Sequence, residues 1–106
     1  MTSESPQRRD ELEPARAIRR ALAVKGLKAR DVGLVVVWST GPLARQRAEL
    51  AVEVGLGRFA SGVEAIYDDP DPMTRCQGAV AAGEVAVAVG LVIGSDGISA
   101  LAFGRP

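Results

Sequence analysis

Apolar runs and amphipathic stretches alternate along the chain and predict a mixture of strands and helices. Residues 34–38 form a continuous, mostly β-branched apolar run, which is typical of a strand covered on both faces. Residues 62–67 alternate moderately and predict a shorter strand. Towards the C-terminus, residues 89–93 and 98–103 flank the sequence Gly-Ser-Asp-Gly. Asp-Gly favours a β-hairpin because glycine accepts a positive φ.

Two helices are expected in the first half of the chain. The first runs from residue 10 or 11 to residue 25, and Gly26 suits the position just after its end. Pro14 is compatible with a helix only in its first turn, which places the start near residue 10. The second helix covers about residues 42–54. The apolar positions of the first helix follow helical spacing and are Leu12, Ala15, Ile18 and Leu22.

A third helix is expected after an acidic, proline-containing loop. Asp71 is suited to cap its N-terminus and Pro72 to be its first residue, so the helix begins near Met73. It ends either at Gly83 or at about Ala88. The resulting order, α-β-α-β-α-β-β, predicts the α/β class, with one mixed, mostly parallel sheet and an antiparallel C-terminal hairpin.

Length and composition predict one domain and a cytoplasmic protein. The chain has 106 residues, which we divide into a disordered polar tail (residues 1–9) and a single domain (residues 10–106). Thirteen basic and thirteen acidic residues give no net charge, so neither nucleic acid nor an anionic membrane is an expected partner. One cysteine suits a reducing compartment, and the first residues lack the apolar segment of a secretory signal.

Three segments follow one another in the order found in β-ketoacyl synthases: Asp31-Val-Gly-Leu-Val-Val-Val-Trp-Ser-Thr-Gly-Pro, Gln77-Gly-Ala-Val-Ala-Ala and Val92-Ile-Gly-Ser-Asp-Gly-Ile-Ser-Ala-Leu-Ala-Phe. The chain therefore resembles the C-terminal half of such an enzyme, within the thiolase-like superfamily. That fold consists of two similar βαβαβαββ halves packed face to face. The resemblance implies that this chain is a single half, without the strand that precedes the first helix unless residues 1–9 form it.

The chain departs from that family at the positions that carry catalysis. It contains no histidine. Trp38 stands where the family has its first catalytic histidine, and the second position falls at Arg75 or Thr74. An indole has one N–H donor and no basic nitrogen, so Trp38 cannot accept a proton near neutral pH. The resemblance thus implies a ketosynthase-like pseudoenzyme.

Cys76 carries the alternative interpretation, a small acyl-transfer enzyme. The residue falls at a predicted helix N-terminus beside Arg75, where the helix dipole lowers a thiol pKa and a thiolate attacks acyl thioesters. Without histidine there is no partner base, so a buried structural cysteine is the preferred interpretation, and whether the protein is an enzyme stays open.

Two further ligand sites are weighed against simpler interpretations. The carboxylates of Asp68, Asp69 and Asp71 could hold a hard cation, although a solvated, proline-stiffened loop is preferred. The turn at residues 39–41 could cradle a phosphate before the second helix, but no glycine-rich fingerprint with lysine accompanies it. Neither a cofactor nor a metal is predicted.

The third helix is expected to mediate association. Its small side chains permit close helix contact, and a lone half of the thiolase fold would otherwise leave it exposed. We expect an isologous homodimer with Met73, Gly78, Ala79 and Ala82 at its interface. A ketosynthase or an acyl-carrier protein is the alternative partner. The implied role is that of a non-catalytic accessory or scaffold subunit in fatty-acid or polyketide-type biosynthesis.

Overall fold

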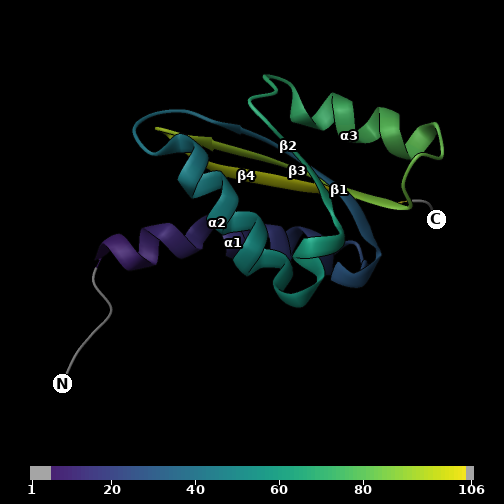
Figure 1. Cartoon of the computed structure of the whole chain (residues 1–106), viewed down its shortest axis with the longest axis horizontal. Helices are drawn as coiled ribbons and strands as arrows, with labels where there is room; N and C mark the ends of the chain where they lie inside the picture. The colour runs from purple at the N-terminus through teal and green to yellow at the C-terminus, as the bar shows by residue number, and fades with distance from the viewer. Residues whose placement is uncertain (1–5, 105–106) are drawn as a thin grey trace.

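The computed structural model describes the backbone of residues 6–104 and the side chains of residues 12–104 (Figure 1). The expected order of helices and strands is confirmed. The elements are α1 (Pro6–Val24), β1 (Val32–Ser39), α2 (Ala44–Leu56), β2 (Glu64–Tyr67), α3 (Pro72–Ala81), β3 (Val87–Gly94) and β4 (Gly97–Gly104). Two 3-10 turns, η1 (Ala29–Asp31) and η2 (Gly57–Gly62), precede β1 and β2.

The four strands form one mixed sheet in the order β2-β1-β3-β4. Strand β1 runs parallel to both β2 and β3, while β4 returns antiparallel to β3 through the predicted hairpin. Helices α1 and α2 cover one face of the sheet and α3 lies on the other (Figure 1). The predicted fold class, a mostly parallel α/β sheet with a C-terminal hairpin, is confirmed.

The two central strands divide the core between the two faces of the sheet. Because side chains alternate along a strand, Val35 and Val37 pack with Leu91 and Ile93 beneath α1 and α2. The opposite set, including Leu34 and Val36, packs against α3 in a smaller cluster, which is completed by Cys76, Ala79, Val80 and Ala88. All of these side chains are buried, so the central strands are covered on both sides.

Glycines end α1 and α3 in the same way. Gly26 has a φ of 67°, and the N–H of Leu27 donates to the carbonyl of Leu22 at 2.9 Å. Gly83 has a φ of 78°, and the N–H of Glu84 donates to the carbonyl of Ala79 at 2.9 Å. Both are Schellman ends, in which a left-handed residue satisfies the last carbonyls of the helix. The third helix therefore ends before Gly83 and does not continue to Ala88.

The predicted start of the first helix is wrong. Helix α1 begins at Pro6, so Pro14 lies inside the helix and not in its first turn. The ring of Pro14 is among the fully buried side chains, and this burial offsets the hydrogen bond that a proline removes from a helix. Of the expected tail, residues 1–5 lie outside the described residues, and residues 6–9 belong to α1.

The second helix also begins later than expected, at Ala44 instead of Pro42. Leu43 adopts a left-handed conformation with a φ of 61°, so the helix cannot extend back through it. Leucine rarely occupies this region, because its Cβ crowds the backbone. The side chain of Leu43 is 65% exposed, and nothing in the described core compensates for this conformation.

Helices α1 and α2 pack closely at Gly55. A Cβ added there would lie 3.2 Å from the Cβ of Ile18 and 3.3 Å from the carbonyl oxygen of Ala15. The Arg19 side chain strengthens the same contact, donating to the carbonyls of Val54 at 2.8 Å and Gly55 at 3.4 Å. This cation at the C-terminus of α2 also complements the helix dipole.

We predict opposite effects for alanine at two helical glycines. Gly55→Ala should lower the free energy of unfolding by about 1 kcal/mol, because the buried Ile18 and the α1 backbone must move apart. In the isolated chain, measured at low protein concentration, Gly78→Ala should raise it by up to about 1 kcal/mol, because that position is open and alanine favours a helix. Urea unfolding of both variants tests this, and a change of the same sign in both would contradict it.

Candidate functional site

The carboxyl ends of β1 and β2 are the natural place for a site in this fold. The chain leaves β1 towards α2 on one face of the sheet and leaves β2 towards α3 on the other. In open α/β sheets, ligands bind in the crevice where neighbouring connections diverge in this way. The residues that reach this edge are Trp38 and Ser39 from β1, and Asp68 and Asp69 after β2.

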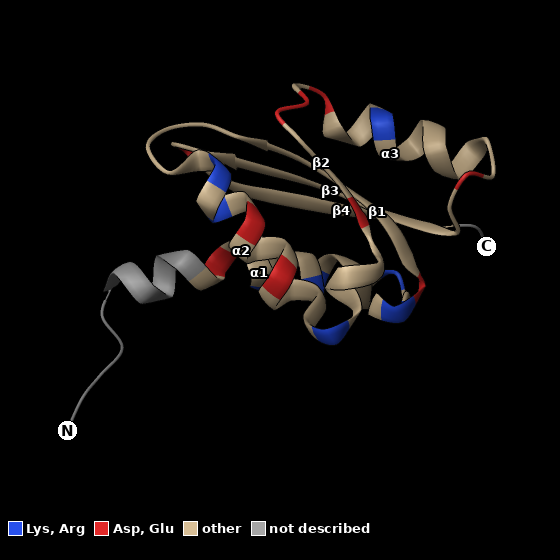
Figure 2. Ribbon diagram, in the orientation of Figure 1, with Lys and Arg blue, Asp and Glu red and all other residues tan. Residues whose placement is uncertain are grey.

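The acidic loop after β2 is organised as the N-terminal cap of α3 (Figure 2). Asp71 accepts a hydrogen bond from the N–H of Thr74 at 3.3 Å, as a capping residue does, and Pro72 is the first helical residue. Asp69 accepts from the N–H of Asp71 at 2.9 Å and pairs with Arg75 at 3.7 Å. The predicted cap is confirmed.

This hydrogen bonding bears on the cation hypothesis. Oxygens of Asp69 and Asp71 are engaged within the loop and with Arg75, while Asp68 takes a left-handed φ of 67°. Among the side chains that the structure describes (residues 12–104), no three His, Cys, Asp or Glu are grouped as a metal ion requires. The loop therefore positions α3, and the structure gives no support to a cation site there.

Cys76 is in the first half of α3, and its side chain lies on the side of the helix that packs against the sheet. Its exposed fraction is 0%, and it packs among Leu34, Val36 and Val80. Burial raises the pKa of the Cys76 thiol from 9.0 to about 11, a backbone hydrogen bond with Val36 lowers it, and the charge of Asp69 raises it further. A nucleophilic cysteine needs a lowered pKa and access to solvent, and Cys76 has neither.

Trp38 and Arg75, which the resemblance predicts to be degenerate catalytic positions, have different surroundings. Trp38 is half-buried near the end of β1, on the face that carries α3, and is paired in register with Val92 of β3. The Arg75 side chain is largely exposed, pairs with Asp69, and lines a shallow hollow with Glu64 and Glu84. Trp38 does not line that hollow.

The turn between β1 and α2 is the predicted phosphate candidate. The N–H of Thr40 is already used, donating to the carbonyl of Ile93 at 3.1 Å. The hydroxyl of Ser39 is buried and has no hydrogen-bond partner in the described part of the chain. No side chain caps α2. A phosphate site would need several convergent donors, and the described turn does not present them.

Sequence analysis did not identify a cluster on the other side of the sheet, between β2 and α2. The Arg45 guanidinium lies 4.1 Å from the centre of the Tyr67 ring and forms an ion pair with Glu49 at 3.1 Å. Burial and then Glu49 raise the pKa of Tyr67, while Arg45 lowers it. The i, i+4 spacing of Arg45 and Glu49 signals their ion pair, but only the fold brings Tyr67 to them.

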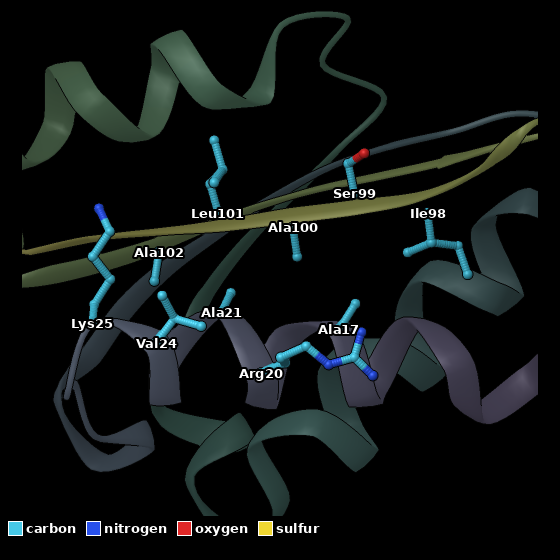
Figure 3. A pocket seen from close by; sticks show the side chains of 10 residues that line it. All are labelled: Ala17, Arg20, Ala21, Val24, Lys25, Ile98, Ser99, Ala100, Leu101 and Ala102. Carbon is cyan, nitrogen blue, oxygen red and sulfur yellow. The ribbon is translucent and has the colours of Figure 1, made fainter.

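A second feature missed from sequence is a groove of about 510 Å³ between α1 and the edge strand β4 (Figure 3). Small side chains create it: Ala17 and Ala21 on the helix face Ala100 and Ala102 on the strand. The helical spacing of the first pair and the strand alternation of the second are visible in the sequence. Their juxtaposition depends on β4 being the outermost strand beside α1.

The four residues predicted for the interface divide between the two sides of α3. Gly78 and Ala82 are exposed on its outer side. Ala79 is buried within the chain's own core, and Met73 is half-buried, with its sulfur over Gly90 of β3. Only Gly78 and Ala82 are therefore available to a partner without unpacking the helix.

Comparison with protein-family models, curated proteins and solved structures finds no match for this chain. The likeness to condensing enzymes thus stays a hypothesis based on the segments named above. None of the helices within residues 6–104 has both the length and the apolar character needed to cross a bilayer.

Cys76 should react slowly with iodoacetamide at pH 8 in the folded protein and quickly once urea unfolds it, because burial keeps the thiol protonated and covered. The raised pKa also has a consequence for stability. Below pH 9 the thiol is neutral in both states, and as the pH rises towards 11 only the unfolded state ionises, so stability falls.

The matched control is Cys76→Ala, which should lose this part of the pH dependence between pH 9 and 11 while keeping the contribution of Tyr67, whose pKa is also raised. Rapid alkylation of the native protein at neutral pH would contradict the structural role of Cys76 and restore the acyl-transfer interpretation.

Proposed function

We propose that the protein is a non-catalytic binding protein that associates with a second copy of itself through α3. By its resemblance to a ketosynthase half, the complex would serve as an accessory or scaffold in fatty-acid or polyketide-type biosynthesis. Burial of the only cysteine supports a binding role over acyl transfer. The observation that carries the proposal is the incomplete cover of the sheet face beneath α3.

Helix α3 is shorter than the strands it covers. Its ten residues extend about 15 Å, whereas the eight residues of β3 extend about 26 Å. The helix therefore leaves the carboxyl-end part of this face open. Trp38 and Val92 are half-buried there, and Leu101, on the same face of β4, is 49% exposed. A second layer would bury these side chains.

The outer side of α3 suits close helix packing. Arg75, Gly78 and Ala82 lie at spacings of three and four residues and so share one stripe, with Glu84 just beyond the helix end. The two small residues let another helix approach its backbone. An antiparallel pair of α3 helices would place Arg75 of each copy near Glu84 of the other, so the stripe is self-complementary in charge and shape.

We predict that light scattering finds a dimer and that Gly78→Arg converts it to a monomer, because the arginine fills the space that the opposing helix needs. The position is open, so the substitution should not disturb the fold. Ala23→Arg is the matched control: Ala23 is exposed on α1, across the sheet, and this variant should remain dimeric.

Charge reversal tests the register of the proposed pair. Arg75→Glu should weaken the dimer by about fivefold to tenfold, and Arg75→Glu combined with Glu84→Arg should restore it. A wild-type protein that stays monomeric at high concentration would contradict the dimer. Co-purification of the dimer with a condensing enzyme or an acyl-carrier protein tests the pathway separately.

A further inference from the structure

Strand β4 presents an open edge to its surroundings. It is the last strand of the sheet, pairing with β3 on one side only. Gly94 and Gly97 close a two-residue hairpin turn, so the pairs Gly94–Gly97, Val92–Ser99 and Gly90–Leu101 are the hydrogen-bonded ones. The N–H and C=O groups of the intervening β4 residues, Ile98, Ala100, Ala102 and Gly104, therefore point away from β3. Ala102 is only 1% exposed, so the open part of this edge is the stretch that contains Ile98 and Ala100, which are half-buried.

This edge lacks the features by which sheets usually protect themselves from further pairing. Strand β4 is eight residues long and carries no charged residue and no proline. No described segment lies beyond it in the sheet. Natural sheets normally shield such an edge with charges, prolines, bulges or a covering segment, so the uncovered, apolar part of β4 around Ile98 and Ala100 indicates a site for strand addition.

The groove between α1 and β4 adds a chemical preference to this edge. Ala17, Ala21, Ala100 and Ala102 form its floor, and Val24, which is 78% exposed, lies on the α1 side (Figure 3). Arg20 and Lys25 also line it, and none of the described acidic side chains does. The groove therefore combines an apolar floor with a positive rim.

A second copy of this chain is a poor occupant of that edge. Two-fold pairing of β4 with its equivalent would place both α1 helices on the same face of the joined sheet. The Arg20 and Lys25 side chains of the two copies would then approach one another, and like charges across an interface disfavour association. An occupant with carboxylates on its α1-facing side would instead be attracted.

We propose that the edge of β4 and the alanine-lined groove bind an extended segment of a partner protein in which acidic and apolar residues alternate. The segment pairs with the outward backbone groups of Ile98 and Ala100, the part of the β4 edge that is not covered. Its acidic side chains turn towards Arg20 and Lys25, and its apolar side chains lie beside Leu101 on the other face. The site includes no residue of α3, and Leu101 is the residue that it shares with the face that the proposed dimer would cover.

The probe is a fluorescein-labelled peptide containing Val-Glu-Val-Glu-Val-Glu-Val, compared with the same peptide in which lysine replaces glutamate. Anisotropy should detect binding of the glutamate peptide only, weakening as salt is added. Arg20→Glu should weaken binding about tenfold or more, whereas Arg16→Glu, on the same helix but outside the groove, should leave it unchanged.

Ala100→Pro tests the backbone pairing. The N–H it removes points outwards, so the ladder with β3 should survive while strand addition is blocked. Amide shifts of residues 98–104 on titration of the wild-type protein give a second readout if that variant folds poorly. The proposal is overturned by equal binding of both peptides, by no binding up to about 1 mM, or by equal effects of Arg16→Glu and Arg20→Glu.

Two outcomes separate this site from the dimer. Gly78→Arg should leave peptide binding intact, and Ala100→Pro should leave the oligomeric state intact. If Ala100→Pro instead dissociates the free protein, β4 is occupied by a second copy, and the peptide-binding proposal is wrong.

Discussion

The fold depends on covering β1 and β3 on both faces at once. Both strands are apolar almost throughout, and burial of each large side chain contributes about 1.5–3 kcal/mol. One layer of helices would leave half of these side chains in water. Helices α1 and α2 therefore cover one face and α3 covers the other. The connection from β1 to β2 runs through α2 on the first face, and the connection from β2 to β3 runs through α3 on the second.

This constraint also determines which residues are available for chemistry. Cys76 anchors α3 to the sheet, so the thiol is used for packing. The acidic loop is used to begin the same helix, through Asp71 and Asp69. Three surfaces remain accessible where the helices do not cover the sheet. They are the outer side of α3, the part of the sheet face next to α3 that includes Trp38, and the free edge of β4. We propose that these surfaces bind partners, and the burial of Cys76 is the observation that favours association over acyl transfer.

Local signals predicted much of this structure. The β-branched run, the Asp-Gly hairpin, the Asp71 cap and the Gly26 end all depend on a few neighbouring residues, and each was confirmed. The start of α1 was missed because burial of Pro14 by distant residues outweighs its local cost. The groove beside β4 likewise arises from packing between segments far apart in the sequence. The left-handed conformation of Leu43 has no such explanation, since its side chain is 65% exposed. The spacing of small and apolar residues along α3 did not predict which side of the helix faces the sheet.

Native-state hydrogen exchange measured by NMR tests the central claim most directly, namely that β1 and β3 hold the fold together while the edge of β4 stays open. The account predicts the slowest exchange for the central amides of β1 and β3, and an alternation along the open part of β4, with Ile98 and Ala100 exchanging much faster than Ser99 and Leu101. Uniform protection along β4 would contradict it, because it would mean that the outer edge is already paired.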